Sequence, residues 1–186
     1  MNRYSDTKKA GIAGIFANIF LLLIKGFIGF FTNSQAMIAD AVNSASDIFA
    51  SLMTFIGNKI ASEPQDASHN FGHGKAEYVF SFLISIAMIL VSVKILYNSA
   101  MTLISGSTLK FSWLLIIICI ITIITKFILY LYTKKLYKKY DNILLLANMK
   151  DHKNDCIVTT FTLISVLLTF RGGVRNLRVR CGGFPL

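Results

Sequence analysis

Long blocks of apolar residues run along the chain and are separated by short polar segments. A helix needs about 20 mainly apolar residues to cross a bilayer. Four blocks meet this requirement, and a fifth is apolar at both ends but polar near its start. We therefore predict an all-α integral membrane protein with five transmembrane helices, at residues 10–31, 36–60, 78–104, 111–133 and 143–170.

Basic residues lie at alternate ends of these spans. They precede the first span, flank the loop after the second and follow the fourth, at Arg3, Lys8, Lys9, Lys59, Lys75, Lys134, Lys135, Lys138 and Lys139. Cytoplasmic loops carry an excess of Lys and Arg. We therefore predict a protein of the cell (plasma) membrane whose N-terminus (residues 1–9), 61–77 loop and 134–142 loop face the cytoplasm.

The composition also favours a membrane protein. Of the 186 residues, 54% are hydrophobic, whereas soluble domains average roughly 45–50% apolar. The formal net charge of +10 could suggest nucleic-acid binding. The lysines, however, lie at the ends of apolar blocks and not along one solvated face, so we expect no nucleic-acid partner.

The last residues, 171–186, differ from the rest of the chain. Four of its five arginines and four glycines fall in these 16 residues, while Lys is the preferred base elsewhere. If the fifth span crosses outward, this basic tail lies outside, against the positive-inside rule. We expect an aberrant tail that follows a frameshift or truncation near residue 170, with a natural basic tail as the alternative.

Three polar residues interrupt the second span. Asp40 precedes Asn43 by three positions, and Asn43 precedes Asp47 by four, so all three share one helical face. Placing one ionised carboxylate at the centre of a membrane costs roughly 2.5–3.5 kcal/mol on insertion scales. Two in one helix need a compensating partner.

The fifth span carries a second polar group. Asp151 and Asp155 are four residues apart and share a face, while His152 is three residues before Asp155 and competes with Asp151 for a place beside it. If the second and fifth spans are adjacent, both groups can converge on one divalent cation. We expect such an ion to offset the burial of the carboxylates, which no other group in the spans is expected to do. The alternative, a helix end dipping into the headgroup region, applies better to the fifth span.

The loop after the second span contains further metal-binding residue types. Asp66, His69 and His73 lie close together, and Gly72 and Gly74 allow a tight backbone around His73. Histidine is a common transition-metal ligand, although such a loop can also be simply solvated.

Three lysines lie within apolar runs. We expect Lys94 and Lys126 to snorkel toward a membrane interface, and the sequence leaves the role of Lys25 open.

Three segments resemble the cation diffusion facilitator family. ADAVNSASD in the second span is similar to the family pattern A-D-A-x-[HDN]-S-x-x-D. FGHGKAE resembles the family's cytoplasmic loop signature, and DHKND resembles its [HD]-x-x-x-D pattern. Their order, spacing and membrane position agree, and the resemblance covers about residues 8–170.

The resemblance implies a transport site at Asn43, Asp47, Asp151 and Asp155. It implies supporting roles for Asp40 and His152, and places Asp66, His69 and His73 where some members bind a second metal ion on the cytoplasmic side. It also implies six spans, a ferredoxin-like C-terminal domain, a homodimer and the exchange of metal for protons. We expect the chain to depart from this pattern, without a sixth span or a C-terminal domain. A truncated, non-transporting remnant is therefore the alternative function.

The four implied transport ligands are one amide and three carboxylates, all offering oxygen. Hard oxygen ligands suit Mg, Ca and Mn, while imidazole and thiolate suit Zn and Cu. The set also resembles that of manganese-exporting members, so we expect Mn(II) export, with Fe(II) and Zn(II) as alternatives. No cofactor or enzymatic activity is expected. Aspartyl intramembrane proteases also pair two Asp residues on two helices, but their Gly-x-Gly-Asp context is absent.

Overall fold

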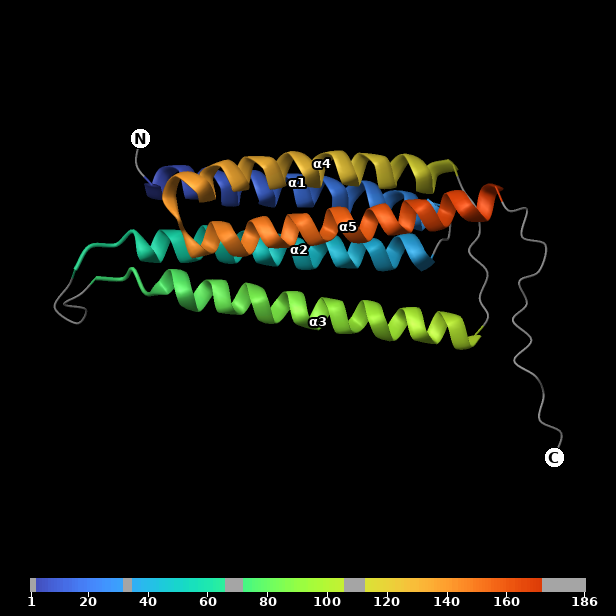
Figure 1. Cartoon of the computed structure of the whole chain (residues 1–186), viewed down its shortest axis with the longest axis horizontal. Coiled ribbons are helices and arrows are strands. Elements are labelled where there is room, and N and C mark those ends of the chain that lie inside the picture. The colour runs from blue at the N-terminus through green and yellow to red at the C-terminus, as the bar shows by residue number, and fades with distance from the viewer. Residues whose placement is uncertain (1–2, 32–34, 66–71, 106–112, 172–186) are drawn as a thin grey trace, which may run out of the picture.

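The computed structural model describes residues 3–31, 35–65, 72–105 and 113–171, which form an all-helical bundle (Figure 1). In this described part the predicted all-α architecture is confirmed: five helices and no strand. The helices are α1 (Arg3–Phe31), α2 (Gln35–Ala61), α3 (Ala76–Ser105), α4 (Trp113–Tyr140) and α5 (Ile143–Arg171).

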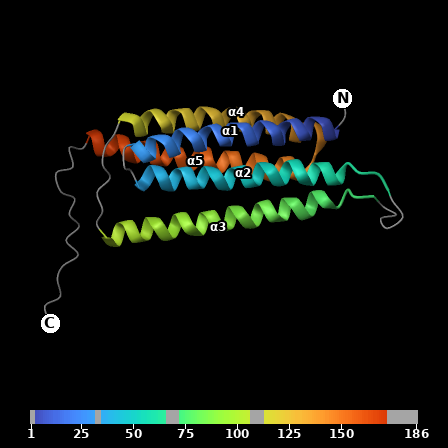
Figure 2. The ribbon, with the colours of Figure 1, turned by 180° about the vertical axis from the view of Figure 1, so that it is seen from behind.

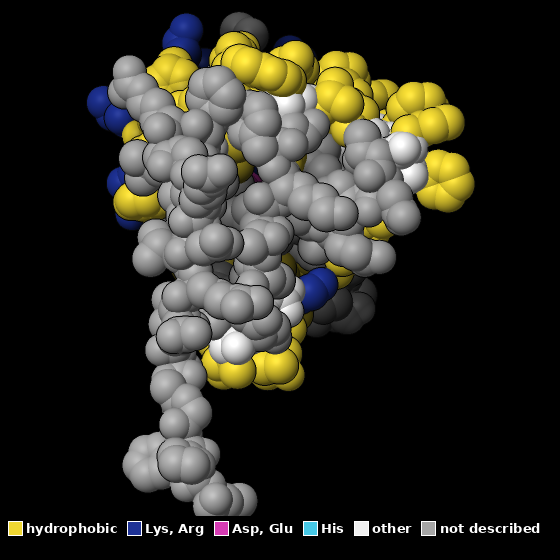
Figure 3. All heavy atoms as spheres, turned by 90° about the vertical axis from the view of Figure 1, so that its right-hand side faces the viewer, with side chains coloured by type: hydrophobic (Ala, Val, Ile, Leu, Met, Phe, Trp, Pro, Cys, Tyr) yellow, Lys and Arg dark blue, Asp and Glu magenta, His cyan; other side chains and the backbone are white. Residues whose placement is uncertain are grey.

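Apolar surface surrounds the bundle. By length and composition, three helices among the described residues can cross a membrane: α1, α3 over Ala76–Asn98, and α4. Helices α2 and α5 have similar lengths, 27 and 29 residues, but are interrupted by the acidic groups. Large apolar side chains face outward around the perimeter (Figure 3), including Phe30 and Leu96, which are 77% and 69% exposed. An apolar belt of this extent suits lipid, and the chain is an integral membrane protein.

The helices have a defined order around the bundle. Helix α1 packs against α2 and α4, and α5 packs against α4 and α2, so these four form a ring. Helix α3 packs against α2 and α5 from outside, and both views show it on one side of the other four (Figures 1 and 2). The two helices with the acidic pairs are therefore direct neighbours, as the shared-site hypothesis requires.

Small residues bring α1 and α2 into close contact. A Cβ atom added at Gly11 would lie 3.1 Å from the backbone nitrogen of Phe55, and one at Gly14 would lie 2.5 Å from Ser51 Oγ. Asn18 Nδ2 donates to Ser51 Oγ at 3.2 Å across the same interface. Close approach at small residues and hydrogen bonds between helices are the usual means of helix association in membranes.

A polar cluster joins three helices at the end of the bundle where the N-terminus lies. Glu77 forms an ion pair with Arg3 and accepts a hydrogen bond from Asn142 Nδ2 at 3.0 Å. Asn142 Oδ1 accepts the backbone N–H of Leu144 at 2.8 Å, which makes Asn142 the N-cap of α5. Glu77 is the last residue of the FGHGKAE motif, so this motif helps to set the position of α5, and with it the position of Asp151 and Asp155.

The α1–α2 contact generates a prediction about stability. Replacing Gly14 with alanine places a methyl group against Ser51, and should lower the unfolding free energy by roughly 1–3 kcal/mol, the usual cost of overpacking. Gly26→Ala is the matched control, because its Cβ would meet no atom of the described residues within 4 Å. Chemical unfolding in detergent followed by circular dichroism measures both. Equal stability of the two variants would contradict the close contact.

Candidate metal site

The polar face of α2 points into the bundle. Asp47 is 6% exposed, and Ser44, Ser51 and Thr54 on the same helix are fully buried. Asn43 is half-buried and the side chain of Asp40 is 43% exposed. Along the face predicted from the spacing, the exposure of the side chains therefore falls from Asp40 to Asp47, and Asp47 is its most buried acidic group.

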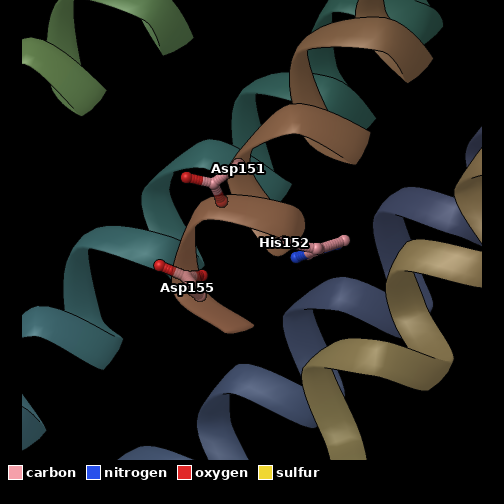
Figure 4. A group of neighbouring side chains, drawn as sticks. All are labelled: Asp151, His152 and Asp155. Carbon is pink, nitrogen blue, oxygen red and sulfur yellow. The ribbon is translucent and has the colours of Figure 1, made fainter. Parts of the chain in front are cut away.

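Helix α5 presents its polar residues to two different sides. Asp151 and Asp155 lie on the side that faces α2, whereas the His152 ring projects toward α1 and α4 (Figure 4). Asp151 is 7% exposed, His152 is fully buried, and the side chain of Asp155 is 18% exposed. The i,i+4 pairing of the two carboxylates is thus seen in the structure.

Lys126 of α4 joins the two acidic helices. Its Nζ atom donates to Asp47 Oδ2 at 2.6 Å and to Asp155 Oδ2 at 2.5 Å, and its side chain is 1% exposed. Because both oxygens contact the same nitrogen atom, the two carboxylates are close enough to share one cation.

Two of our expectations about Lys126 were wrong. It does not snorkel to an interface, because it lies inside the bundle. The expectation that only a metal ion could offset the buried carboxylates also fails, since the Lys126 ammonium already contacts two of them. Helix α4 carries no acidic residue of its own, so the sequence pattern offered no sign of this partner.

Lys94 is exposed, and its proposed snorkelling stays a prediction.

The other groups near this pair lack partners. Among the described residues, Asp151 Oδ2 and both ring nitrogens of His152 are buried without a hydrogen-bond partner. One ligand atom from each of Asp151, His152 and Asp155 lies within 4.8 Å of the others. Buried polar atoms are rarely left unpaired without a reason, so these groups are suited to receive a ligand. His152 therefore keeps its place as a competitor to Asp151, although its ring projects from another side of α5.

A cavity of about 610 Å³ leads to the acidic residues of α2 and α5. Asn43, Asp47, Asp151, Asp155 and Lys126 line it, so it brings together the four implied transport ligands and the lysine. The remaining lining includes α3 from Ala87 to Asn98, Leu115 near the start of α4 and Val166 near the end of α5. These positions lie toward the end of the bundle opposite the N-terminus (Figure 1), so the cavity extends from the acidic pair toward that end.

Asp40 has its own partner, Lys25. The Lys25 ammonium is 3% exposed, lies 3.0 Å from Asp40 Oδ2 and donates to Ser44 Oγ at 3.1 Å. This contact answers the question that the sequence left open for Lys25. Asp40 and Lys25 line the same cavity as Asp47, Asp151 and Asp155, but Asp40 is paired with Lys25 and not with Lys126.

The loop after α2 is described only in part. Asp66 and His69 lie outside the described residues, as do residues 172–186 of the expected aberrant tail. His73 Nδ1 lies 3.2 Å from the Pro64 carbonyl oxygen, and Gly72 has a φ of 72°, a value that favours glycine. The loop metal site stays a prediction.

The fold and the site together define a class of protein. The described helices form an apolar bundle, and its interior holds a group of carboxylates that a cavity reaches. An interior of this kind is suited to passing a cation through a membrane.

The chain belongs to the cation diffusion facilitator family of cation efflux transporters, because the family's cation efflux transmembrane domain matches residues 11–175. This is a family of transporters and not of enzymes.

Several curated proteins are similar. The chain is 32% identical over 174 residues to the manganese efflux system protein MneP of Bacillus subtilis (strain 168), covering 94% of this chain and 58% of MneP. It is 31% identical over 170 residues to the manganese efflux system protein MneS of the same organism, covering 90% and 59%. It is 27% identical over 162 residues to the magnetosome protein MamM of Magnetospirillum gryphiswaldense (strain DSM 6361 / JCM 21280 / NBRC 15271 / MSR-1), covering 87% and 51%. The chain thus spans little more than half the length of these relatives.

Proposed function

We propose that this chain binds a divalent metal ion between α2 and α5 and exports it from the cytoplasm across the plasma membrane. The observation that carries the proposal is the meeting of Asp47 and Asp155, from two helices, at one point beside the unpartnered Asp151 oxygen. Three ionised carboxylates and one ammonium carry a formal charge of about −2, which one divalent cation balances.

Manganese is the proposed substrate. Asn43, Asp47, Asp151 and Asp155 all offer oxygen, and oxygen ligands suit Mn(II) better than they suit Zn(II). Two relatives are named as manganese efflux proteins, which supports the same metal. Fe(II) and Zn(II) are the alternatives, and a nitrogen ligand from His152 would favour zinc.

Proton antiport and a homodimer complete the proposal. Both rest on the family resemblance. Carboxylates that have released a metal ion are suited to carry protons in return. In the proposed orientation, the polar cluster of Glu77 and Asn142 lies on the cytoplasmic side, and the cavity extends toward the outside.

The orientation generates a prediction. In a chain with its native cysteines replaced by serine, a Ser68→Cys variant should be protected from a membrane-impermeant thiol reagent applied to intact cells, because the 61–77 loop is proposed to be cytoplasmic. Ser107→Cys, between α3 and α4, is the matched control and should react. The reverse pattern would show that the orientation is inverted.

The site generates a prediction about transport. In cells without their own manganese exporters, Asp47→Ala and Asp155→Ala should abolish the manganese resistance that the full chain confers, with protein levels unchanged. Each loss leaves the ion under-coordinated and alters the charge balance. His152→Ala should do less harm than Asp151→Ala.

Three outcomes count against parts of this assignment. Undiminished resistance in an alanine variant removes that residue from the site. Greater harm from His152→Ala places the imidazole, and not Asp151, in the site. A parent chain that confers no resistance to any of the three metals contradicts export by this chain and supports the non-transporting alternative.

The ligand set generates a prediction about selectivity. Asn43→His replaces a hard amide oxygen with an imidazole nitrogen, which favours zinc over manganese. Cells carrying this variant should lose manganese resistance and gain zinc resistance. A parent chain that already prefers zinc would refute the manganese assignment. An unchanged preference in the variant would show that Asn43 does not set selectivity.

A further inference from the structure

Lys126 occupies the point at which a shared metal ion would bind. Its ammonium contacts Asp47 of α2 and Asp155 of α5 at 2.6 and 2.5 Å. A divalent cation sits roughly 2.0–2.6 Å from its oxygen ligands. A metal ion bound to these same two oxygens would lie against the Lys126 nitrogen, at a distance where both cations cannot remain.

We propose that Lys126 is a tethered cation that takes the place of the metal ion beside Asp47 and Asp155 and exchanges with it. This inference rests on the proposed function and extends it to a residue on a third helix. When metal enters, the ammonium leaves the two carboxylates. When the ammonium returns to the two carboxylates, it displaces the metal ion.

The charges around the lysine favour such an exchange. An empty site without Lys126 would leave Asp47, Asp151 and Asp155 together inside an apolar bundle, where unpaired charges are strongly unfavourable. With the lysine in place, two of the three carboxylates are paired. The Asp151 Oδ2 atom has no hydrogen-bond partner among the described residues. Asp151 lines the cavity and projects from the same side of α5 as Asp155 (Figure 4), so we expect it to contact an incoming ion.

Helix α4 also offers a place for the displaced ammonium. Thr122 lies one turn before Lys126, is 2% exposed and lines the same cavity, and its Oγ1 atom has no hydrogen-bond partner among the described residues. Side chains on a helix lean toward its N-terminus, which directs a lysine toward the residue four positions earlier. The flexible stem of Lys126 can therefore reach Thr122 Oγ1 through the cavity without leaving the bundle.

The exchange predicts an order of affinities. Mn²⁺ binding is measured on the full chain in lipid nanodiscs, from the loss of the free-ion electron paramagnetic resonance signal. Lys126→Gln removes the competing cation and should tighten Mn²⁺ binding by about tenfold or more, as expected for removal of a close buried charge. Lys126→Arg keeps the charge and offers more donors to the carboxylates, so it should bind Mn²⁺ more weakly than the parent.

Thr122 provides an independent test of the exchange. Thr122→Val keeps the shape of the side chain but removes the oxygen that receives the ammonium, and should weaken Mn²⁺ binding by about three- to tenfold, the range for a hydrogen bond to a charged group. In a Lys126→Gln background the same change should have no effect, because no ammonium needs to be received. Equal effects in both backgrounds would overturn the role of Thr122.

Matched controls separate exchange from general effects. Lys94→Gln removes one positive charge from the lining of the same cavity, without touching the contacts of Lys126, and should leave Mn²⁺ affinity within about twofold. If Lys126→Gln folds only when Mn²⁺ is present, the exchange is supported, because the metal then replaces the missing cation. If Lys126→Gln does not fold at all, the Mn²⁺ affinities of the Lys126→Arg and Thr122→Val variants test the exchange instead.

The possible results distinguish this inference from the proposed function. If the parent binds Mn²⁺, Fe²⁺ or Zn²⁺ but Lys126→Gln binds that metal no more tightly, the exchange is refuted and the metal site stands. If neither binds any of these ions, the proposed function fails and the exchange fails with it. Binding by Lys126→Gln alone would support the exchange strongly.

Discussion

Carboxylates buried in an apolar bundle require positive charge beside them, and the structure depends on how that charge is supplied. Asp47 and Asp155 belong to two different helices, yet both contact the ammonium of Lys126. Removing one partner of such a group leaves an unpaired charge in a medium of low polarity, which is far more costly than the pair is favourable. The contact therefore ties α2, α4 and α5 together at the level of the site, while Asp40 is balanced separately by Lys25.

The packing of the bundle makes this arrangement possible. Glycines at the α1–α2 contact let those helices approach closely, and the ring of α1, α2, α5 and α4 makes the two acidic helices neighbours. At the end where the N-terminus lies, Glu77 joins Arg3 of α1 to Asn142, which caps α5. The FGHGKAE motif thus helps to position the site although it does not line it. Its glutamate, Glu77, contacts the residue that caps α5, and Asp151 and Asp155 follow two to three turns later on the same helix.

The family connects this geometry to metal transport. The match over residues 11–175 covers every described helix except the first turns of α1, and the relatives named as manganese efflux proteins align over nearly the whole chain. Around the proposed site, the carboxylates of Asp47 and Asp155 contact the Lys126 ammonium, and the same cavity is lined by all three side chains.

The sequence by itself determined the helical class and the acidic pairs, which depend on local periodicity, and the family, which depends on three short motifs. Apolar block length predicts helices, and a spacing of four residues places Asp47 with Asn43 and Asp155 with Asp151 on shared faces. Only the tertiary structure decided what balances these charges. Lys126 lies in an apolar run 79 positions after Asp47 and 29 before Asp155, and no local pattern distinguishes it from a lysine that snorkels. Its role depends on which face of α4 meets α2 and α5, and packing between distant segments sets that face.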